Sequence, residues 1–255
     1  MLWIKQTIKT LLRQIAMKKF ISILAIAAVA ALAFVSCGKD NSNGNGDDND
    51  KGESGIQTPK KAAAEATADD IGKVIGADGN IYADASAATA AGTTVVAKIV
   101  YVGSDNCENA PYNHGLALAL TDADSDSYGY FNWRTSNTDA GHNKQTENFT
   151  KESGLQYNAT HNKDEYPAFK AAIANNGAAA PKACSAWFLA SAYQWKKINE
   201  AGSILLIDAD GFKKLNGYFY WSSSEFDAAE AWMRGSSQKR NKNEAVGCVR
   251  SCLAF

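Results

Sequence analysis

Residue types that bind metals and carry acid–base catalysis are scarce in this chain. Histidine occurs three times in 255 residues, at His114, His142 and His161, and none lies at metal-ligand spacing from a cysteine or carboxylate. The zinc-protease motif His-Glu-x-x-His, the nucleophile turn Gly-x-Ser-x-Gly, the Walker loop and the dinucleotide fingerprint are absent. We therefore predict that the protein is not an enzyme, has no cofactor and binds no metal.

An excess of charge of one sign is also missing. The formal net charge is -1, which gives no overall reason to expect a nucleic acid partner. Basic residues gather locally at Lys239, Arg240 and Lys242, and such a run is most often a solvated face.

The chain lacks an apolar run long enough to cross a bilayer, which takes about 20 residues. The run at 20–34 follows a basic segment at 17–19 and precedes small residues and Cys37, which is the pattern of a lipoprotein signal peptide. We predict a signal peptide at 1–36, with translation starting at Met17, and lipidation of Cys37. A plain secretory signal cut near Cys37 is the alternative.

Gly, Asn, Asp and Ser dominate residues 38–56, which hold too few apolar side chains to offset the entropy of folding. We predict a flexible linker, with the lipidated cysteine and linker together covering 37–68. Asp40 and the acidic run 47–50 resemble the signal that exports lipoproteins to the outer face of the outer membrane. The expected location is thus the outer membrane, lipid-anchored and facing the cell exterior.

Residues 69–255 are predicted to form one α+β domain. Alternating β-branched and apolar residues predict an antiparallel pair of buried strands at 93–101 and 114–120. A helix is expected at 165–175, which has proline near its start, and another at 191–202, which Ser191 would cap. Weaker patterns predict the remaining elements, which are a helix at 60–68, a turn at 76–79, a strand at 80–83 and a helix at 84–91.

Asp122, Asp124 and Asp126 have the spacing of the first ligands of a calcium loop. The loop would need glycine where Ser127 stands and glutamate where Trp133 stands, so we reject a calcium site. We expect 122–126 to be a solvated loop.

The C-terminal segment 217–255 combines an aromatic cluster at 218–221, a serine triplet at 222–224 and a second tryptophan at Trp232. Runs of this kind, separated by Gly, Ser and Asn, predict short antiparallel strands. The polar, basic turn at 235–243 indicates a displayed surface supported by the aromatic residues.

These motifs carry a resemblance to a known group of proteins. Tyr-Trp-Ser-Ser-Ser-Glu at 220–225, Ala-Trp at 231–232 and Val-Arg-x-x-Leu-Ala-Phe at 249–255 resemble the end of C-type-lectin-fold domains in bacterial surface lipoproteins. Some of those are variable proteins of diversity-generating retroelements. Trp-Phe-Leu-Ala-Ser at 187–191 is similar to the same group, although Ala190 stands where proline is usual.

The resemblance, which covers about 95–255, implies a C-type-lectin-like fold of short strands and two helices that binds an unknown protein or glycan through its C-terminal face. Trp187, Trp221 and Trp232 would be buried framework. Aromatic residues and arginine supply much of the energy at interfaces, which selects the candidate ligand contacts Phe226, Asp227, Glu230, Met233, Arg234, Gln238 and Arg240.

Two other functions stay open at this point. The first is a fixed-specificity adhesin or pilus-associated structural lipoprotein. The second is an enzyme related to the formylglycine-generating enzymes, which would use Cys248 and Cys252. The pairing of Cys107, Cys184, Cys248 and Cys252 cannot be derived from their positions, and free thiols are equally compatible with them.

Overall fold

The computed structural model describes residues 60–124, 129–142, 144–146, 149–217, 219–234 and 238–255. The predicted signal peptide, Cys37, most of the predicted linker and Asp126 lie outside the described residues. All elements below belong to the unit that begins at Ile56 and ends at Phe255.

A seven-stranded antiparallel sheet forms the centre of this unit, in the order β1-β3-β2-β4-β5-β10-β6. The long strands β4 (Val95–Val102) and β5 (Gly115–Ala119) pair as predicted, and every residue of β5 is buried. On one side lie β2 (Val74–Gly76), β3 (Asn80–Tyr82) and β1 (Lys61–Ala62). On the other side the C-terminal strand β10 (Ser251–Ala254) pairs with both β5 and the short β6 (Phe188–Leu189).

Three predicted helices form where their end signals place them. Asp84 caps α2 (Ala85–Ala90) by accepting the Ala87 N–H, and Pro167 opens α4 (Pro167–Ala174). Ser191 and Gln194 form a capping box on α5 (Ala192–Asn199). The structure adds the short helix α3 (Asn158–His161) and the 3-10 turns Leu155–Tyr157, Asn175–Gly177 and Gly202–Leu206.

The helix predicted at 60–68 is wrong. This segment forms β1 and two 3-10 turns, Ala63–Glu65 and Ala68–Asp70. Ala63 donates its N–H to the carbonyl of Gly79, and both Ala63 and Ala66 are buried in a cluster under the sheet. Tertiary contacts therefore override the helix propensity of alanine, and the folded domain starts upstream of residue 69.

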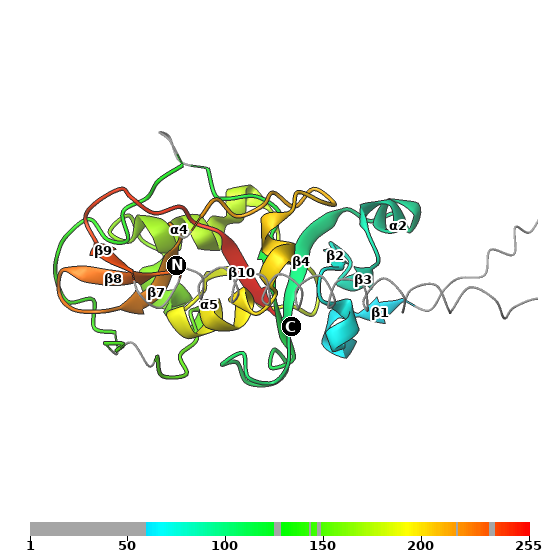
Figure 1. The fold of residues 1–255 in the computed structure, drawn as a ribbon, viewed down its shortest axis with the longest axis horizontal. Helices are drawn as coiled ribbons and strands as arrows, with labels where there is room; N and C mark the ends of the chain where they lie inside the picture. The colour runs from blue at the N-terminus through cyan, green and yellow to red at the C-terminus, as the bar shows by residue number, and fades with distance from the viewer. Residues whose placement is uncertain (1–59, 125–128, 143, 147–148, 218, 235–237) are drawn as a thin grey trace, which may run out of the picture. The chain divides into compact units, whose positions relative to one another are not determined.

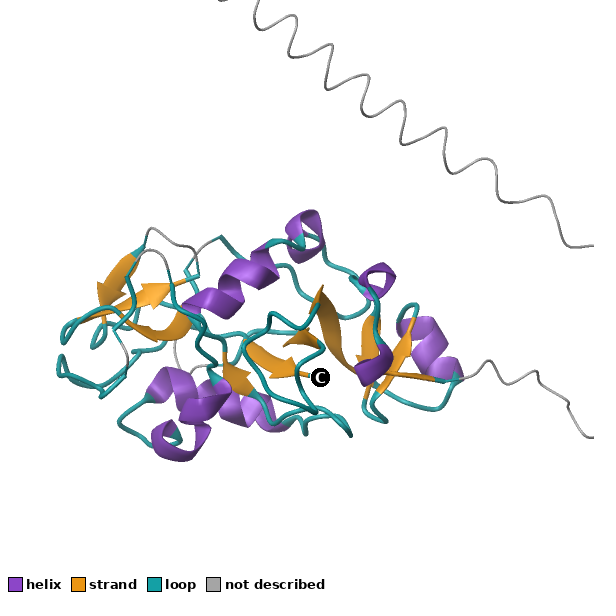
Figure 2. Ribbon diagram, turned by 90° about the horizontal axis from the view of Figure 1, so that it is seen from below, coloured by secondary structure: helices purple, strands orange, loops and turns teal. Residues whose placement is uncertain are grey.

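A second, three-stranded antiparallel sheet consists of β7 (Trp221–Glu225), β8 (Glu230–Met233) and β9 (Lys239–Asn241), in that order. Figures 1 and 2 place it at the end of the described unit opposite to β1, β2 and β3. The predicted short C-terminal strands are therefore present, but they are divided between this sheet and β10.

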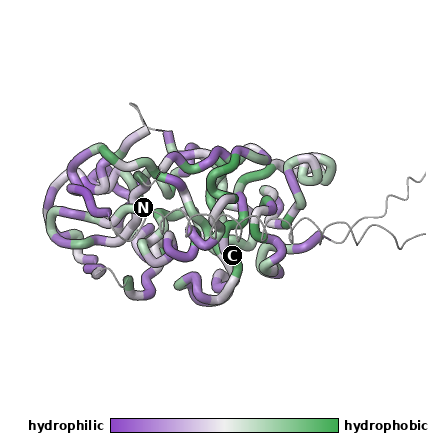
Figure 3. The backbone as a smooth tube through the Cα atoms, viewed as in Figure 1, coloured by the Kyte–Doolittle hydropathy of each residue, from purple (hydrophilic) through white to green (hydrophobic). Residues whose placement is uncertain are grey.

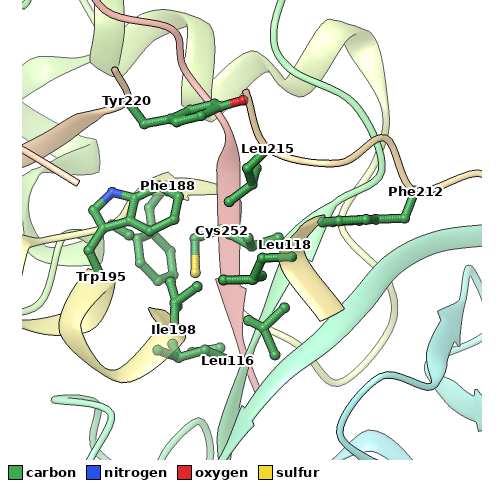
Figure 4. Close-up of a cluster of buried hydrophobic side chains, with 13 residues drawn as sticks. Leu116, Leu118, Phe188, Trp195, Ile198, Phe212, Leu215, Tyr220 and Cys252 are labelled. Atoms are coloured by element: carbon green, nitrogen blue, oxygen red, sulfur yellow. The ribbon is translucent and has the colours of Figure 1, made fainter. Parts of the chain in front are cut away.

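The largest apolar cluster lies between the central sheet and α5. Figure 4 shows Cys252 of β10 in this cluster with Leu118 of β5, Phe188 of β6 and Trp195 of α5. Hydrophobic residues follow the central strands in Figure 3, whereas hydrophilic residues are frequent around β8 and β9. The three-stranded sheet of β7, β8 and β9, which we call the end sheet, is thus richer in hydrophilic residues than the central strands.

Arg250 joins three separate parts of the chain just before β10. Its fully buried guanidinium donates to Asp122 Oδ1 at 2.6 Å and to the carbonyls of Ala119, Leu120 and Lys213 at 3.0–3.2 Å. Asp122 also accepts a hydrogen bond from the Tyr220 hydroxyl. The prediction of a solvated loop is therefore wrong for Asp122, whose half-buried carboxylate joins Arg250 to Tyr220.

The observed architecture confirms the α+β class. None of the helices in the described ranges is long and apolar enough to span a membrane. Cys107, Cys184, Cys248 and Cys252 are all free thiols.

Candidate ligand-binding face

The framework tryptophans are buried, as predicted. Trp232 donates its indole N–H to the carbonyl of Gln145 at 2.8 Å, and Trp221 donates to Phe131 at 2.6 Å. Trp187 donates to the carbonyl of Ala178. Each buried indole N–H therefore has a hydrogen-bond acceptor, and Trp221 and Trp232 are fixed within the three-stranded sheet.

Two serines of β7, Ser222 and Ser224, form hydrogen bonds to β8 and to the start of α5. Ser222 donates its hydroxyl to the carbonyl of Trp232 at 2.7 Å, and Ser224 accepts the N–H of Ala192 at the start of α5. The hydroxyls of Ser222 and Ser224 thus tie β7 to β8 and α5, whereas the buried Ser223 hydroxyl has no hydrogen-bond partner among the described residues.

Lys242 and Glu225, at the end of β7, form a fully buried ion pair. Lys242 donates its ammonium to Glu225 Oε1 and to the carbonyls of Thr138 and Ala228, and neither charged side chain is exposed. Burial lowers the pKa of Lys242, and the hydrogen bond to Glu225 opposes that effect. The expectation that Lys242 belongs to a solvated basic patch is therefore wrong.

The pairing of β8 with β9 determines which side chains share a face. Trp232 lies opposite Lys239, and Glu230 lies opposite Asn241, so these four residues point to the same side of the sheet. Phe226 joins them, because its ring packs edge-on against Trp232 at 5.3 Å. We call the half-buried residues Phe226, Glu230 and Lys239, together with the tryptophan below them, the Trp232 face.

Lys239 is the central feature of the Trp232 face. Its ammonium lies 3.6 Å from the centroid of the Phe226 ring and 5.2 Å from that of Trp232. Cation–π attraction at this distance holds a flexible lysine in one position. In the sequence, Lys239 is recognisable only as part of a charge run, because its place over two aromatic rings depends on the strand register between β8 and β9.

Gln238 and Arg240 lie on the other side of the same sheet. Arg240 lies opposite Ala231 in the strand register, and the backbone carbonyl of Gln238 accepts the N–H of Met233. Strand alternation therefore separates these two candidates from Phe226 and Glu230. The seven predicted ligand contacts do not form one surface.

Two of the predicted contacts are wrong because they are buried. Met233 is fully buried in a cluster with Trp221 and Trp133. Arg234 is 5% exposed and donates to Asn199 Oδ1 and to the carbonyl of Gly217, each at 2.8 Å. Both side chains serve the scaffold.

Asp227 has a structural task at the turn between β7 and β8. Its Oδ1 atom accepts the N–H groups of Ala229 and Glu230 at 2.8 and 2.7 Å. This is an Asx-type turn, in which the carboxylate orders the backbone that presents Glu230.

Sequence reasoning missed a buried polar cluster beneath the end sheet. His142 and His161 bring their Nε2 atoms to 2.7 Å, and Tyr157 stacks on His142 at 3.7 Å. Tyr157 also donates to Glu152, whose pKa is raised by burial. All four residues lie between positions 142 and 161, but their spacing follows neither helix nor strand periodicity, so no sequence pattern predicts the cluster.

In the described part of the chain, no group of three or more His, Cys, Asp and Glu side chains is placed to hold a metal ion. Burial raises the pKa of Cys248 to about 11 and that of Cys252 well above its usual value, so both thiols are protonated at neutral pH.

Comparisons of the chain with protein-family models, with curated proteins and with solved structures give no match.

Proposed function

We propose that this protein is a lipid-anchored surface protein that binds a protein or glycan ligand through the Trp232 face. The observation that carries the proposal is the position of Lys239, held over Phe226 beside Glu230 on a rigid, fully buried tryptophan framework. We keep the C-type-lectin-like fold and retroelement diversification as parts of the proposal that rest on the motif resemblance alone.

The physical basis is preorganisation. A ligand that contacts Phe226 and Lys239 finds an aromatic surface and a charge already in place, so little side-chain entropy is lost on binding. Lys242 and Glu225 neutralise each other below the face, which leaves Glu230 and Lys239 to set its charge pattern. Such a pattern contributes to specificity and to the rate of association.

Alanine substitutions test the Trp232 face against its reverse side. We expect Phe226→Ala or Lys239→Ala to weaken binding to surface glycans or proteins about tenfold or more, since each removes one side of the cation–π contact. Arg240→Ala on the opposite side is the matched control and should leave Kd unchanged. The measurement is the Kd of the wild type and of each variant, obtained by biolayer interferometry with ligands selected on the wild-type protein. A larger loss in Arg240→Ala than in Phe226→Ala would refute the proposed face.

The anchor has its own test. We expect Cys37→Ser to abolish incorporation of labelled fatty acid and to move the protein from the membrane fraction to the medium or periplasm, because serine offers no thiol for the diacylglyceryl group. Metabolic labelling and cell fractionation measure this, with Cys107→Ser as the matched cysteine control. Mass spectrometry that finds an unmodified Cys37 at the mature N-terminus of the wild type would rule out the anchor.

A further inference from the structure

The two buried histidines form a hydrogen-bonded pair that connects a loop to a helix. His142 lies in the loop segment 138–142, and His161 ends α3. They are 7% and 5% exposed, and their Nε2 atoms are 2.7 Å apart. At this distance one nitrogen must carry the proton and the other must accept it.

The other partners of the two rings determine where the protons lie. The Nδ1 atom of His142 is 3.0 Å from the carbonyl oxygen of Ser223, which can only accept, so this nitrogen is protonated. In the neutral ring its Nε2 atom is then a bare acceptor, and the proton between the rings belongs to His161. The Nδ1 atom of His161 lies 2.6 Å from the Thr160 hydroxyl, which is also 3.3 Å from the backbone carbonyl oxygen of Tyr157.

Additional protons have no favourable place in this pair. One extra proton would bury an imidazolium, and a second would bring two N–H groups face to face. The charged groups that act on the rings include the cations Arg134, Lys163 and Lys242 and the carboxylate of Glu165. Two further carboxylates lie one contact away, since Glu225 pairs with Lys242 and Glu152 accepts from the Tyr157 hydroxyl. The rings of Trp133, Tyr157, Tyr166 and Phe169 pack against the pair.

The loop that carries His142 covers the outer edge of β7. Ala140 donates its N–H to Glu225 Oε1 at 2.9 Å, and Gln145 donates its N–H to the Glu225 carbonyl at 2.9 Å. Gln145 in turn accepts the indole N–H of Trp232. The histidine pair therefore holds in place the loop that hydrogen-bonds to β7, to Glu225 of the Lys242–Glu225 ion pair, and to the indole of Trp232.

We propose that the His142–His161 pair is an acid-sensitive latch, which holds the loop on β7 at neutral pH and lets the loop leave β7 more often in mildly acidic solution. Opening would loosen the end sheet and weaken the Trp232 face. That consequence for binding rests on the proposed function, whereas the opening of the loop does not.

The direction of the pH effect follows from burial. Burial and the neighbouring positive charges hold the pKa of His142 at about 3 and that of His161 at about 4, below the ordinary value of 6.5. The opened state therefore binds more protons, and the closed state is fully favoured above pH 6.5 and loses stability as the pH falls toward 4. Between pH 7 and pH 5 the opening equilibrium should rise about twentyfold for each histidine and about five-hundredfold for both.

Amide hydrogen exchange on the full chain measures the opening. After correction for intrinsic exchange, protection of the Ala140 and Gln145 amides should fall about five-hundredfold between pH 7 and pH 5. The Ile99 amide, bonded to the Lys73 carbonyl in the central sheet, should keep its protection. No ligand is needed, so failure of the proposed function leaves this test intact.

Two variants separate the latch from a general acid effect. His161→Gln can still donate to His142 and leaves one titrating ring, so the fall should shrink to about twentyfold. His114→Gln removes the one histidine outside the pair and should behave like the wild type. Wild-type protection that does not change with pH, or that changes equally in His161→Gln, would overturn the latch.

Nitrogen-15 NMR of the histidine rings in the wild type keeps the proposal testable if the variant does not fold. The latch requires a protonated Nδ1 on His142 and a protonated Nε2 on His161 at pH 7. Rings that titrate near 6.5 while the Ala140 amide stays protected would contradict it.

Discussion

Lys242→Met should destabilise the protein by about 3–5 kcal/mol, because it leaves the carboxylate of Glu225 buried without its counter-ion. The substitution also removes the donor to the carbonyls of Thr138 and Ala228. The aliphatic volume is nearly conserved, so the loss reports on charge and hydrogen bonding, not on a cavity. Urea unfolding followed by tryptophan fluorescence measures it.

Two controls separate the effect of the buried charge from the general effect of losing a lysine. Adding Glu225→Gln to Lys242→Met removes the stranded charge, so the double variant should be more stable than the two single losses added together. Lys170→Met breaks the exposed pair with Asp164 and should cost less than about 1 kcal/mol. If Lys242→Met cost no more than Lys170→Met, the pair would have to be in contact with water.

Arg250→Met should cost a similar amount, about 3–5 kcal/mol, for a different reason. The guanidinium satisfies the carbonyls of Ala119, Leu120 and Lys213 at once, and methionine can satisfy none of them. It also leaves Asp122 without its ion-pair partner. Thermal unfolding should show the loss as a lower Tm.

Arg250→Lys distinguishes hydrogen-bond geometry from charge. A single ammonium cannot reproduce the planar fork that reaches Asp122 and Lys213 together, so most of the stability should stay lost. Arg240→Met, on the half-buried outer strand, is the control and should change stability by less than about 0.5 kcal/mol. Wild-type stability in Arg250→Lys would show that only the positive charge matters there.

The sequence predicted those parts of the fold whose signals are local. The strands at 93–101 and 114–120 were identifiable from β-branched alternation, α5 from the cap Ser191, and α2 from its alanine-rich composition. The short β2 and the segment 60–68 were not, because three residues give too little periodicity and because burial of Ala63 is decided by distant contacts.

The candidate site shows the same division. The motif resemblance implied buried Trp221 and Trp232. Met233 also proved to be core, because it packs in one cluster with Trp221 and Trp133. Arg234 is hydrogen-bonded to Asn199 at the end of α5, and Lys242 forms a buried ion pair with Glu225, so neither side chain is available to a ligand. Each of these partners is distant in the sequence or depends on strand register, and composition alone could not place them.

Site-specific photo-cross-linking on intact cells tests the binding face most directly. A benzophenone side chain introduced at position 241, which lies on the same side of the sheet as Trp232, should give an adduct with the ligand, and Phe226→Ala should strongly reduce it. The same group at position 240, on the reverse side of the sheet, should give little or none. Equal adducts from position 240, or an adduct at position 241 that is unchanged in Phe226→Ala, would contradict ligand binding at the Trp232 face.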